Sequence, residues 1–532
     1  MQTLYSIVTG GLAMSRRLLV VLVGLLLVSS CGGGATGSGG SKQGDKLTIA
    51  IGIDPDTLDP MRQTTTTVQN IVQMTVETLV RVDTDGKVQP LLATSWQTSS
   101  DGLSWTFTLR SGVKFSDGEP LNAAAVKSSL DRVLAPGNTC PLCGPFRAVS
   151  SIDAVDDTHV RINLQKPVAP LLGLLTEVTF GIIAPNSIAQ GTDNYKDQEK
   201  PIGTGPYVLT DRVKGDHVTL TRNDQYWGSK PSYKSQVFKI VPESASREAL
   251  VRAGQADVIL LPPVSDLPAM RKDSSLKVIL APGDRTIFLA FNTQDPSQPL
   301  LQKPEVRQAL NYAVNKDQIV KSILFGAATP MDAPMASTLF GYCKIGSYPY
   351  DPTKAKQMLA AAGASNLSIK FVSPTGRYIQ DFQAAQAIAN DLSAVGVKVD
   401  GPRTMDWPTY LGTINVPPAK ASVDLHLLGW APGYLDASQA MVQFQSTQWP
   451  PKGLATSYYK NPDVDQLLAK ASSESNQAAR AADYCSASRM IWQDAPWIFL
   501  WVQRFPIVTT AKVTGVQSIP NESFYTVYAS PA

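Results

Sequence analysis

Residues 368–399 have the sequence SIKFVSPTGRYIQDFQAAQAIANDLSAVGVKV, in which a helical pattern lies between two short apolar runs. The runs at 368–372 and 397–399 predict strands. Between them, apolar residues recur at three- and four-residue spacing from about Tyr378 to Leu392, which predicts a helix. Gly396 follows as the left-handed residue that commonly ends a helix. The order strand, helix, strand predicts an α/β layer architecture.

The flanking sequence continues this mixture of strands and helices. Residues 304–325 predict either a pair of amphipathic helices or one interrupted helix. Asp351 and Pro352 form the N-cap and first-turn pair of a helix that ends at Gly363. Alternating apolar residues predict further strands at 47–53, 105–109, 160–164 and 423–429. No repeat of about 20 to 50 residues is present, which argues against solenoids and propellers.

The N-terminus carries a basic start, an apolar run and a small-residue cleavage site. Two arginines precede the apolar run at 18–28, whereas residues 1–13 fit no part of such a signal, so Met14 is the expected start. The run has 11 residues, fewer than the roughly 20 that a membrane-spanning helix needs. Residues 1–30 are therefore interpreted as a cleavable signal peptide.

The four residues Val28-Ser-Ser-Cys31 resemble the lipobox of bacterial lipoproteins. The resemblance implies that a peptidase cuts before Cys31 and that its thiol carries a diacylglycerol, whose two acyl chains suffice for lasting attachment. Residues 31–44 then form a flexible tether rich in glycine and serine. The alternative is an ordinary secretory signal followed by an incidental cysteine.

Size and charge exclude some classes of protein. Removing residues 1–30 leaves 502 of 532 residues, more than one hydrophobic core usually serves, so several domains are expected. The removed segment holds two arginines and no acid, so the formal charge falls from +3 to +1. Without a concentrated basic face, nucleic acid is not an expected partner.

Four further cysteines remain after Cys31, and an even number in an oxidising compartment fits two disulfides. Cys140 and Cys143 lie among Pro, Gly and Asn, which favours a local structural disulfide over a redox pair. Cys343 and Cys485 are then the two cysteines left to form the second disulfide. The sequence does not show that these two residues meet.

No pattern for catalysis or metal binding is visible. His159, His217 and His426 lie far apart in the sequence, which argues against a histidine-rich metal site and leaves no triad motif. Gly203-Thr-Gly-Pro-Tyr207 lacks the endings of nucleotide-binding loops and predicts a tight turn before a strand. The chain is therefore expected to be no enzyme and to need no cofactor.

Several sequence blocks, in the same order, resemble the family 5 extracellular solute-binding proteins of ABC importers, the group of periplasmic dipeptide- and oligopeptide-binding proteins. Most recognisable is the run from Pro90 to Trp96, followed by WTFTLRSGVKFSDG at 105–118. The other blocks are Gly203 to Tyr207, Phe291 to Thr293, Val306 to Ala313 and Tyr350 to Lys356. Together these blocks span most of the chain.

The resemblance implies an α/β fold of two hinged lobes around a cleft, with an extra inserted domain. Carried over in order, lobe I comprises residues 45–76, 200–284 and 500–532, the inserted domain 77–199, and lobe II 285–499. The hinge crossings are expected at 285–292 and 497–504. A monomer is expected.

In peptide-binding members of the family, an acidic residue shortly after a Gly-Trp pair holds the amino group of the ligand. The matching stretch here runs from Gly429 to Asp436, and the acidic position is occupied by Gly433. Asp436 could replace it, or it could cap the helix that follows. Trp430 and Tyr434 are candidates for aromatic contacts with the ligand, with core packing as the rival role for Trp430.

Other candidate ligand contacts come from three more places. Trp407 and Tyr410, expected in a loop-rich run after a strand, would contribute aromatic faces or pack in the core. Asp54 to Leu58 match a family segment that lines the cleft from the other lobe. Arg377 could bind a ligand carboxylate through two hydrogen bonds, or it could be a solvated surface residue.

The resemblance implies an extracytoplasmic, lipid-anchored receptor that captures a peptide or peptide-like solute by hinge closure and delivers it to ABC permease subunits. Two alternatives stay open. One is the same fold binding a non-peptide ligand such as an oligosaccharide or glycolipid, which the glycine at 433 would favour. The other is a cell-envelope regulatory lipoprotein without transport.

Overall fold

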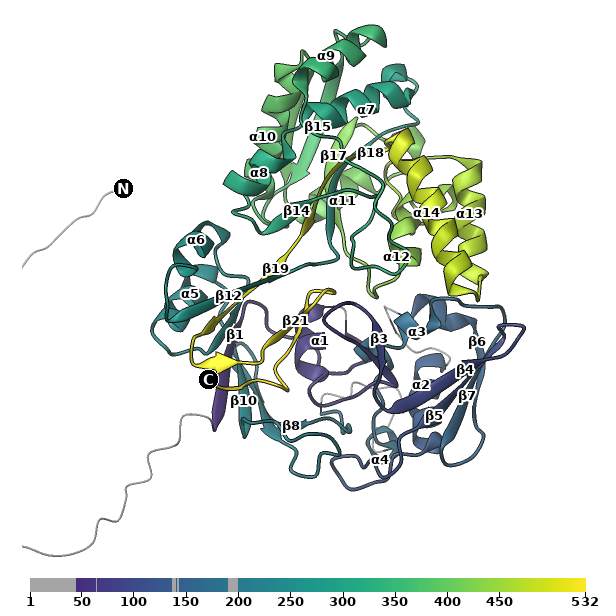
Figure 1. Cartoon of the computed structure of the whole chain (residues 1–532), viewed down its shortest axis with the longest axis vertical. Coiled ribbons are helices and arrows are strands. Elements are labelled where there is room, and N and C mark those ends of the chain that lie inside the picture. The colour runs from purple at the N-terminus through teal and green to yellow at the C-terminus, as the bar shows by residue number, and fades with distance from the viewer. Residues whose placement is uncertain (1–44, 64, 136–139, 141–142, 190–199) are drawn as a thin grey trace, which may run out of the picture. The chain divides into compact units, whose positions relative to one another are not determined.

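The computed structural model describes residues 45–63, 65–135, 140, 143–189 and 200–532 (Figure 1). The predicted signal peptide, Cys31 and the tether lie outside the described residues. Within the described ranges, no helix combines the length and the apolar character needed to cross a membrane.

A seven-stranded sheet with its helices forms what we call the first lobe, and the chain enters it through β1 (Lys46–Ile51). β1 pairs in parallel with β10 (Ser235–Ile240) on one side and β11 (Val258–Leu260) on the other. The strand order is β12-β19-β11-β1-β10-β9-β8, with β8 Tyr207–Val213, β9 His217–Arg222, β12 Leu276–Ala281 and β19 Phe505–Thr510.

Both faces of this sheet are buried because alternate side chains enter different cores. Leu47, Ile49 and Ile51 pack into one core, whereas Ala50 packs into the other. Residues of α5 (Ser244–Arg252) and α6 (Leu267–Met270) contribute to the core around Ala50. Residues of α1 (Thr66–Val72) contribute to the core on the opposite face.

A six-stranded sheet forms the second lobe and contains the predicted strand, helix, strand unit. β15 (Ser368–Pro374), α10 (Asp381–Ala394) and β16 (Lys398–Met405) follow one another, and the two strands pair in parallel. The strand, helix, strand order predicted for residues 368–399 is therefore confirmed. The strand order is β14-β18-β13-β17-β15-β16, with β13 Thr286–Phe291, β14 Ala328–Pro330, β17 Leu425–Trp430 and β18 Trp497–Gln503.

Helices cover both faces of the second sheet (Figure 1). On one face the core includes residues of α7 (Pro304–Ala313), α8 (Lys316–Ser322), α9 (Pro352–Ala361) and α10. On the other it includes residues of α11 (Trp407–Ile414), α12 (Ala437–Met441), α13 (Pro462–Ser473) and α14 (Gln477–Asp494). The segment 304–325 is thus a helix pair, because Val314 is extended and Asn315 caps the second helix.

The loop-rich environment expected for Trp407 and Tyr410 is wrong, because both residues belong to α11. The Asp406 carboxylate accepts a hydrogen bond from the Thr409 backbone N–H at 3.1 Å and so caps this helix. Pro408 occupies its first turn. An Asp followed two residues later by Pro is a helix-start signal that the sequence contained.

Residues between the first strands of the first lobe form a third structural part, the inserted domain. Its four-stranded sheet has the order β4-β5-β7-β6, and α2 (Ala123–Leu134) packs on it. The strands are β4 Ala93–Thr98, β5 Ser104–Leu109, β6 Val149–Ala154 and β7 His159–Leu164. Trp105, Phe107 and Leu109 are buried in alternation, as predicted.

Smaller elements complete the described chain. The remaining helices are α3 (Leu171–Leu174) and α4 (Pro185–Ala189). Two-stranded pairs are formed by β2 (Val80–Val82) with β3 (Val88–Pro90), β20 (Val513–Thr514) with β23 (Ser530–Pro531), and β21 (Gln517–Ile519) with β22 (Ser523–Tyr525). The turn predicted at 203–207 leads directly into β8.

The chain passes from the first sheet to the second between Ala281 and Thr286, and returns between Gln503 and Phe505. Because β18 continues to Gln503, the second sheet extends past the boundary expected at residue 499. The domain bounds given above otherwise stay a prediction.

The four cysteines expected in the mature chain form two pairs. Cys140 lies next to Cys143, and Cys343 lies next to Cys485 on α14. The Cα atoms are 5.5 Å apart in each pair, within the range that a disulfide spans. The structure therefore brings together the two residues that the sequence left as a residual pairing.

Candidate ligand-binding cleft

A cavity of about 720 Å³ lies between the two lobes, and we call it the interlobe cavity. The first lobe contributes Ile53, Leu261 and Phe505 to its wall, and the second contributes the segment from Gly376 to Gln380. A side cavity of about 280 Å³ extends along the second lobe. Arg285, Arg377 and Tyr378 line both spaces. Their volumes fall near the range of small-molecule sites, roughly 300–1,000 Å³.

Asp381 fixes the loop that carries Arg377 into these cavities. Its carboxylate accepts hydrogen bonds from the backbone N–H groups of Gly376 at 3.0 Å, Arg377 at 2.8 Å and Tyr378 at 3.0 Å. Gly376 adopts φ +73°, which glycine accepts without strain. The loop between β15 and α10 is therefore held in one shape by a single side chain.

Arg377 presents its guanidinium against two aromatic rings. The Cζ atom lies 5.2 Å from the centre of the Tyr378 ring and 5.0 Å from that of Trp407. Among the described residues it has no carboxylate partner, and its side chain is exposed. Cation–π contacts hold such a group in place while leaving its donors free. The arrangement suits a ligand that carries a carboxylate.

Trp430, at the end of β17, lines the side cavity together with Trp407. Its indole Nε1 donates a hydrogen bond to the backbone carbonyl of Gln439 at 2.8 Å, which fixes the ring. The Gln439 side chain also accepts from the backbone N–H of Gly433 at 2.5 Å. Gly433 is exposed and brings no charge to the cleft.

Tyr434 points away from both cavities. Its ring is 2% exposed and belongs to the hydrophobic core of the inserted domain. A Cβ atom added to Gly173 of that domain would lie 3.3 Å from Tyr434 Cδ2, so the ring packs directly on this glycine. The structure thus places Tyr434 where the second lobe meets the inserted domain.

Asp436 is buried and paired inside the protein. Arg480 donates to its two carboxylate oxygens at 2.7 and 2.5 Å, and the backbone N–H of Ser438 donates at 2.9 Å. Arg480 is 1% exposed. These contacts favour the helix-capping role of Asp436 over the binding of a ligand amine, because its oxygens already have partners.

The other predicted contacts lie in the lobe interiors or beside the cleft. Tyr410 is fully buried and donates to the Leu427 carbonyl. Leu58 belongs to the core of the first lobe. Asp54 is half-buried and accepts a hydrogen bond from the Gly215 backbone N–H at 2.8 Å. Its neighbour Ile53, rather than Asp54, lines the interlobe cavity. Arg377, Trp407 and Trp430 are the predicted residues that the structure brings together.

Arg285 is a cleft residue that the sequence did not indicate. It lies in the crossing between β12 and β13, and its guanidinium donates to both carboxylate oxygens of Glu522 at 2.6 Å each. The two residues are 237 positions apart. No local sequence pattern predicts an ion pair between residues so far apart in the chain.

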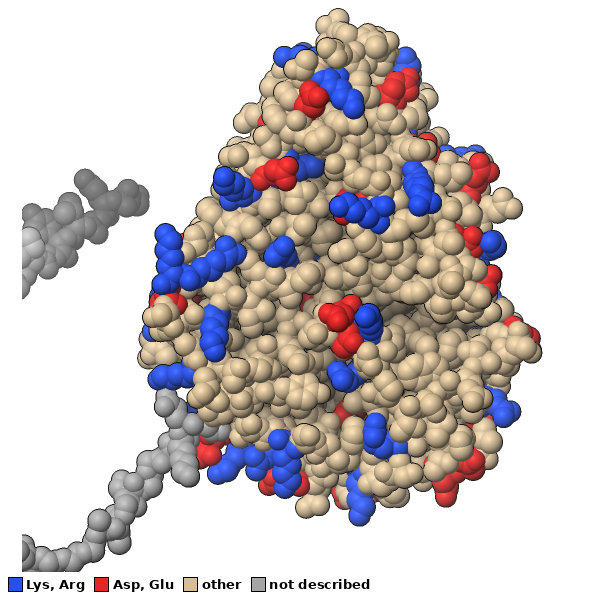
Figure 2. Space-filling model, in the orientation of Figure 1, with Lys and Arg blue, Asp and Glu red and all other residues tan. Residues whose placement is uncertain are grey.

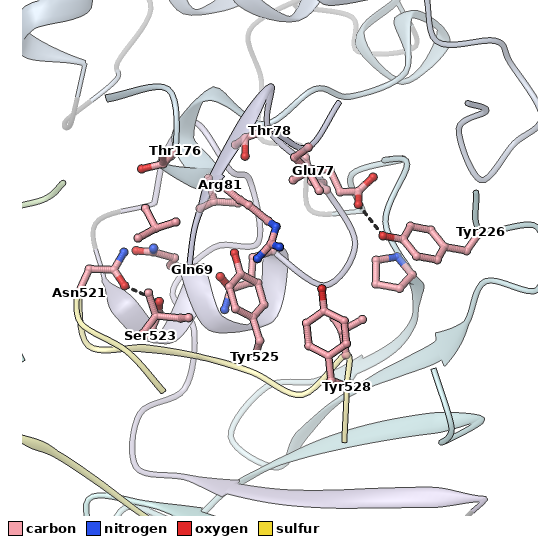
Figure 3. Close-up of a pocket in the computed structure, with 18 residues that line it drawn as sticks. Gln69, Glu77, Thr78, Arg81, Thr176, Tyr226, Asn521, Ser523, Tyr525 and Tyr528 are labelled. Atoms are coloured by element: carbon pink, nitrogen blue, oxygen red, sulfur yellow. Dashed lines mark hydrogen bonds between the residues drawn. The ribbon is translucent and has the colours of Figure 1, made fainter. Parts of the chain in front are cut away.

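Two further cavities lie outside the cleft. Figure 3 shows a polar cavity of about 60 Å³ around Arg81, Gln69 and Tyr525, too small for a peptide and suited to water. Glu77 lines this cavity, and burial raises the pKa of its carboxyl group to about 7, although hydrogen bonds from Trp227, Thr204 and Tyr226 lower it. A cavity of about 680 Å³ between the inserted domain and the second lobe includes Trp96 and Phe340.

No group of three or more metal-ligating side chains is found in the part of the chain that the structure describes. His426 is buried on β17, with Nε2 2.7 Å from the Thr456 hydroxyl, and burial lowers its pKa to about 3. It remains neutral at physiological pH.

Two lobes joined by two crossings, with a cavity between them, define a two-lobed solute-binding protein. The family model described as "Bacterial extracellular solute-binding proteins, family 5 Middle" matches residues 87–451. The chain belongs to this family. It is a substrate-binding protein of ABC importers that acts outside the cytoplasm, and it is not an enzyme.

Named relatives cover nearly the whole chain. The glutathione-binding protein GsiB of Pectobacterium atrosepticum is 32% identical over 480 residues, 90% of this chain and 92% of the relative. HbpA2 of Haemophilus parasuis superposes with a TM-score of 0.82 at 26% identity, covering 92% of this chain and all of that one. The periplasmic binding protein DppA of Helicobacter pylori, in complex with the peptide STSA, superposes with a TM-score of 0.72 at 26% identity. The match covers 91% of this chain and 98% of DppA.

Proposed function

We propose that this protein captures a small peptide or peptide-like solute that carries a carboxylate, and delivers it to an ABC permease. The observation that carries the proposal is the Arg377 guanidinium, which has no carboxylate partner in the described part of the chain and is held against Tyr378 and Trp407 where it lines both cavities. The relatives named for glutathione and for the peptide STSA support a ligand of this chemistry.

Closure around the ligand is the proposed mode of capture. A solute bridging Arg377 and the apolar wall formed by Ile53 and Leu261 contacts both lobes only when they are close. Ligand shifts the hinge equilibrium because it binds the closed arrangement more tightly than the open one. Docking on the permease then opens the lobes and releases the solute.

A non-peptide solute, such as an oligosaccharide, is the second candidate. Gly433 carries no carboxylate, and Asp436 is occupied by Arg480, so a free amine has no acidic partner at the position that the family resemblance implies. The rings of Trp407 and Trp430 suit sugar rings as well as peptide planes.

The test is native mass spectrometry of the protein from its own host, followed by calorimetric titration with glutathione, the peptide Ser-Thr-Ser-Ala and an oligosaccharide panel. Copurified peptide and peptide affinity would support the proposal. A copurified saccharide, or a cleft that binds none of the peptides, would reject it.

Replacing Arg377 by leucine should weaken glutathione binding by roughly 10- to 100-fold, because a hydrogen bond to a charged group contributes about 1.5–3 kcal/mol. Arg377→Lys should retain part of the affinity, since it keeps the charge but loses the planar fork. The exposed Arg403, which pairs with Asp400, provides the matched control. Equal affinity for Arg377→Leu and Arg403→Leu would remove Arg377 from the binding site.

Anchoring through Cys31 is a further part of the proposal. Cys31→Ser should move the protein from the membrane fraction to the soluble fraction and abolish labelling with a radioactive fatty acid, because no other acylated group would hold it. Cys31→Ala should behave identically. Membrane retention and labelling of both variants would refute the lipid anchor.

A further inference from the structure

The interlobe cavity and the side cavity are lined by more positive than negative charge. Two guanidinium groups, of Arg285 and Arg377, and one carboxylate, of Glu522, line them. Both oxygens of this carboxylate already accept hydrogen bonds from Arg285. Among the described residues that line the two cavities, no other acid is present. A solute ammonium that leaves water here loses its hydration without gaining an ionic partner, which is strongly unfavourable.

Two side chains that line these cavities offer hydrogen-bond donors to a solute. The Arg377 guanidinium has no carboxylate partner in the described chain and lies against the rings of Tyr378 and Trp407. Gln443 lines the side cavity from a short 3₁₀ turn, η6 (Val442–Phe444). Its Nε2 is buried and has no hydrogen-bond partner among the described residues. Both groups favour a solute that brings carbonyl or carboxylate oxygens.

The first lobe contributes an apolar wall to the interlobe cavity. Ile53 is 58% exposed and Leu261 is 42% exposed, although both side chains are large and apolar. Phe505 and Pro506 line the same cavity. Exposed apolar side chains that gather in a cavity mark a surface for an apolar part of a ligand.

The backbone of Leu261 is held in a conformation that leucine rarely adopts. Its φ of +48° lies in the left-handed region. Arg247 is 5% exposed and donates to the Leu261 carbonyl at 2.8 Å and to three further backbone carbonyls at 2.9, 2.8 and 2.7 Å. The Leu261 N–H donates to the Pro506 carbonyl at 2.9 Å. Backbone strain that the surroundings maintain in this way is typical of ligand-contacting positions.

The outer surface carries charges of both signs. Figure 2 shows Lys, Arg, Asp and Glu side chains scattered over one face of the protein, without an extended area of one sign. The formal net charge of the chain is +3 over 532 residues, which gives little long-range attraction for a solute of either sign. Selection between a charged and a blocked amine therefore depends on the groups that line the cavities.

We propose that the solute is an N-acylated peptide, whose carboxylate binds Arg377 and whose acyl group covers the apolar wall of Ile53 and Leu261. This inference rests on the proposed function and narrows it to peptides with a blocked amino group. Acylation removes the ammonium charge, for which the cavities hold no free carboxylate, and adds a carbonyl acceptor. The acyl carbons leave water when they contact the wall, which favours binding.

The experiment is calorimetric titration of the purified protein at neutral pH with glutathione and with Ser-Thr-Ser-Ala, each in its free, N-acetyl and N-butanoyl form. The N-acetyl form of each peptide should bind at least about tenfold more tightly than the free form, because no ammonium has to be desolvated. The N-butanoyl form should gain about tenfold more, since it buries two further CH₂ groups.

Ile53→Asn and Leu261→Asn remove the apolar contact, and asparagine tolerates the left-handed backbone at position 261. In both variants the advantage of the butanoyl over the acetyl form should disappear, while the N-acetyl form should still bind more tightly than the free peptide. Val155→Asn is the matched control, because Val155 is 47% exposed but lines neither cavity. It should keep the full butanoyl advantage.

The affinities of the unchanged protein decide the proposal even if the variants fail to fold. Equal or tighter binding of the free peptides would overturn it and leave the proposed peptide-binding function intact. Absence of a gain from acetyl to butanoyl would overturn the contact with the apolar wall, as would a gain that persists in Ile53→Asn and Leu261→Asn. Binding of no peptide in any form would instead reject the proposed function itself.

Discussion

Replacing Arg480 by leucine should lower the free energy of unfolding by about 3–5 kcal/mol, because it leaves the Asp436 carboxylate buried without its partner. Asp436 is 5% exposed and Arg480 1%. The leucine would keep some of the packing that the guanidinium makes against the rings of Phe340 and Tyr484. Urea denaturation followed by tryptophan fluorescence measures the change.

Arg403→Leu serves as the control, since Arg403 and Asp400 form an exposed pair whose loss should cost at most about 1 kcal/mol. The double variant Arg480→Leu/Asp436→Leu should recover part of the loss, because it removes the uncompensated charge. If Arg480→Leu unfolds like the control, the pair is not holding the segment after Trp430.

The sequence predicted those elements of the fold whose determinants are close together. The unit from β15 to β16 was predicted because apolar spacing, a glycine cap and a short following strand agree over 32 residues, 368–399. The start of α10 was placed three residues early, since Tyr378 to Gln380 form a turn in which Gln380 has φ +52°. Local apolar pattern alone does not distinguish that turn from a first helical turn.

The site was less accessible from the sequence, because its contacts join distant residues. Trp407, Trp430 and Arg377 were candidates for their side-chain chemistry, and the structure brings them to one wall. Arg285 and Glu522, 237 positions apart, carry no pattern that links them. Tyr434 shows that a position close in sequence to Trp430 need not face the ligand. Its ring packs in the core of the inserted domain.

Tyr434→Ala should have the second large effect, a loss of about 3–5 kcal/mol in the free energy of unfolding, by analogy with the removal of other large buried aromatic rings. The ring comes from the second lobe but fills a space in the core of the inserted domain, against Gly173. Its removal therefore weakens the contact that joins these two parts of the protein. Glutathione affinity should fall in parallel if this contact holds the second lobe in the arrangement that binds solute.

Tyr434→Phe separates packing from ligand contact. The hydroxyl lies 3.4 Å from Ser438 Oγ, a weak interaction, so the phenylalanine variant should keep stability and affinity close to those of the unchanged protein. A ligand-contacting tyrosine would give a different result, with reduced affinity and an unaltered urea midpoint for Tyr434→Ala. Stability and affinity should change together if Tyr434 couples solute capture to the contact between the inserted domain and the second lobe.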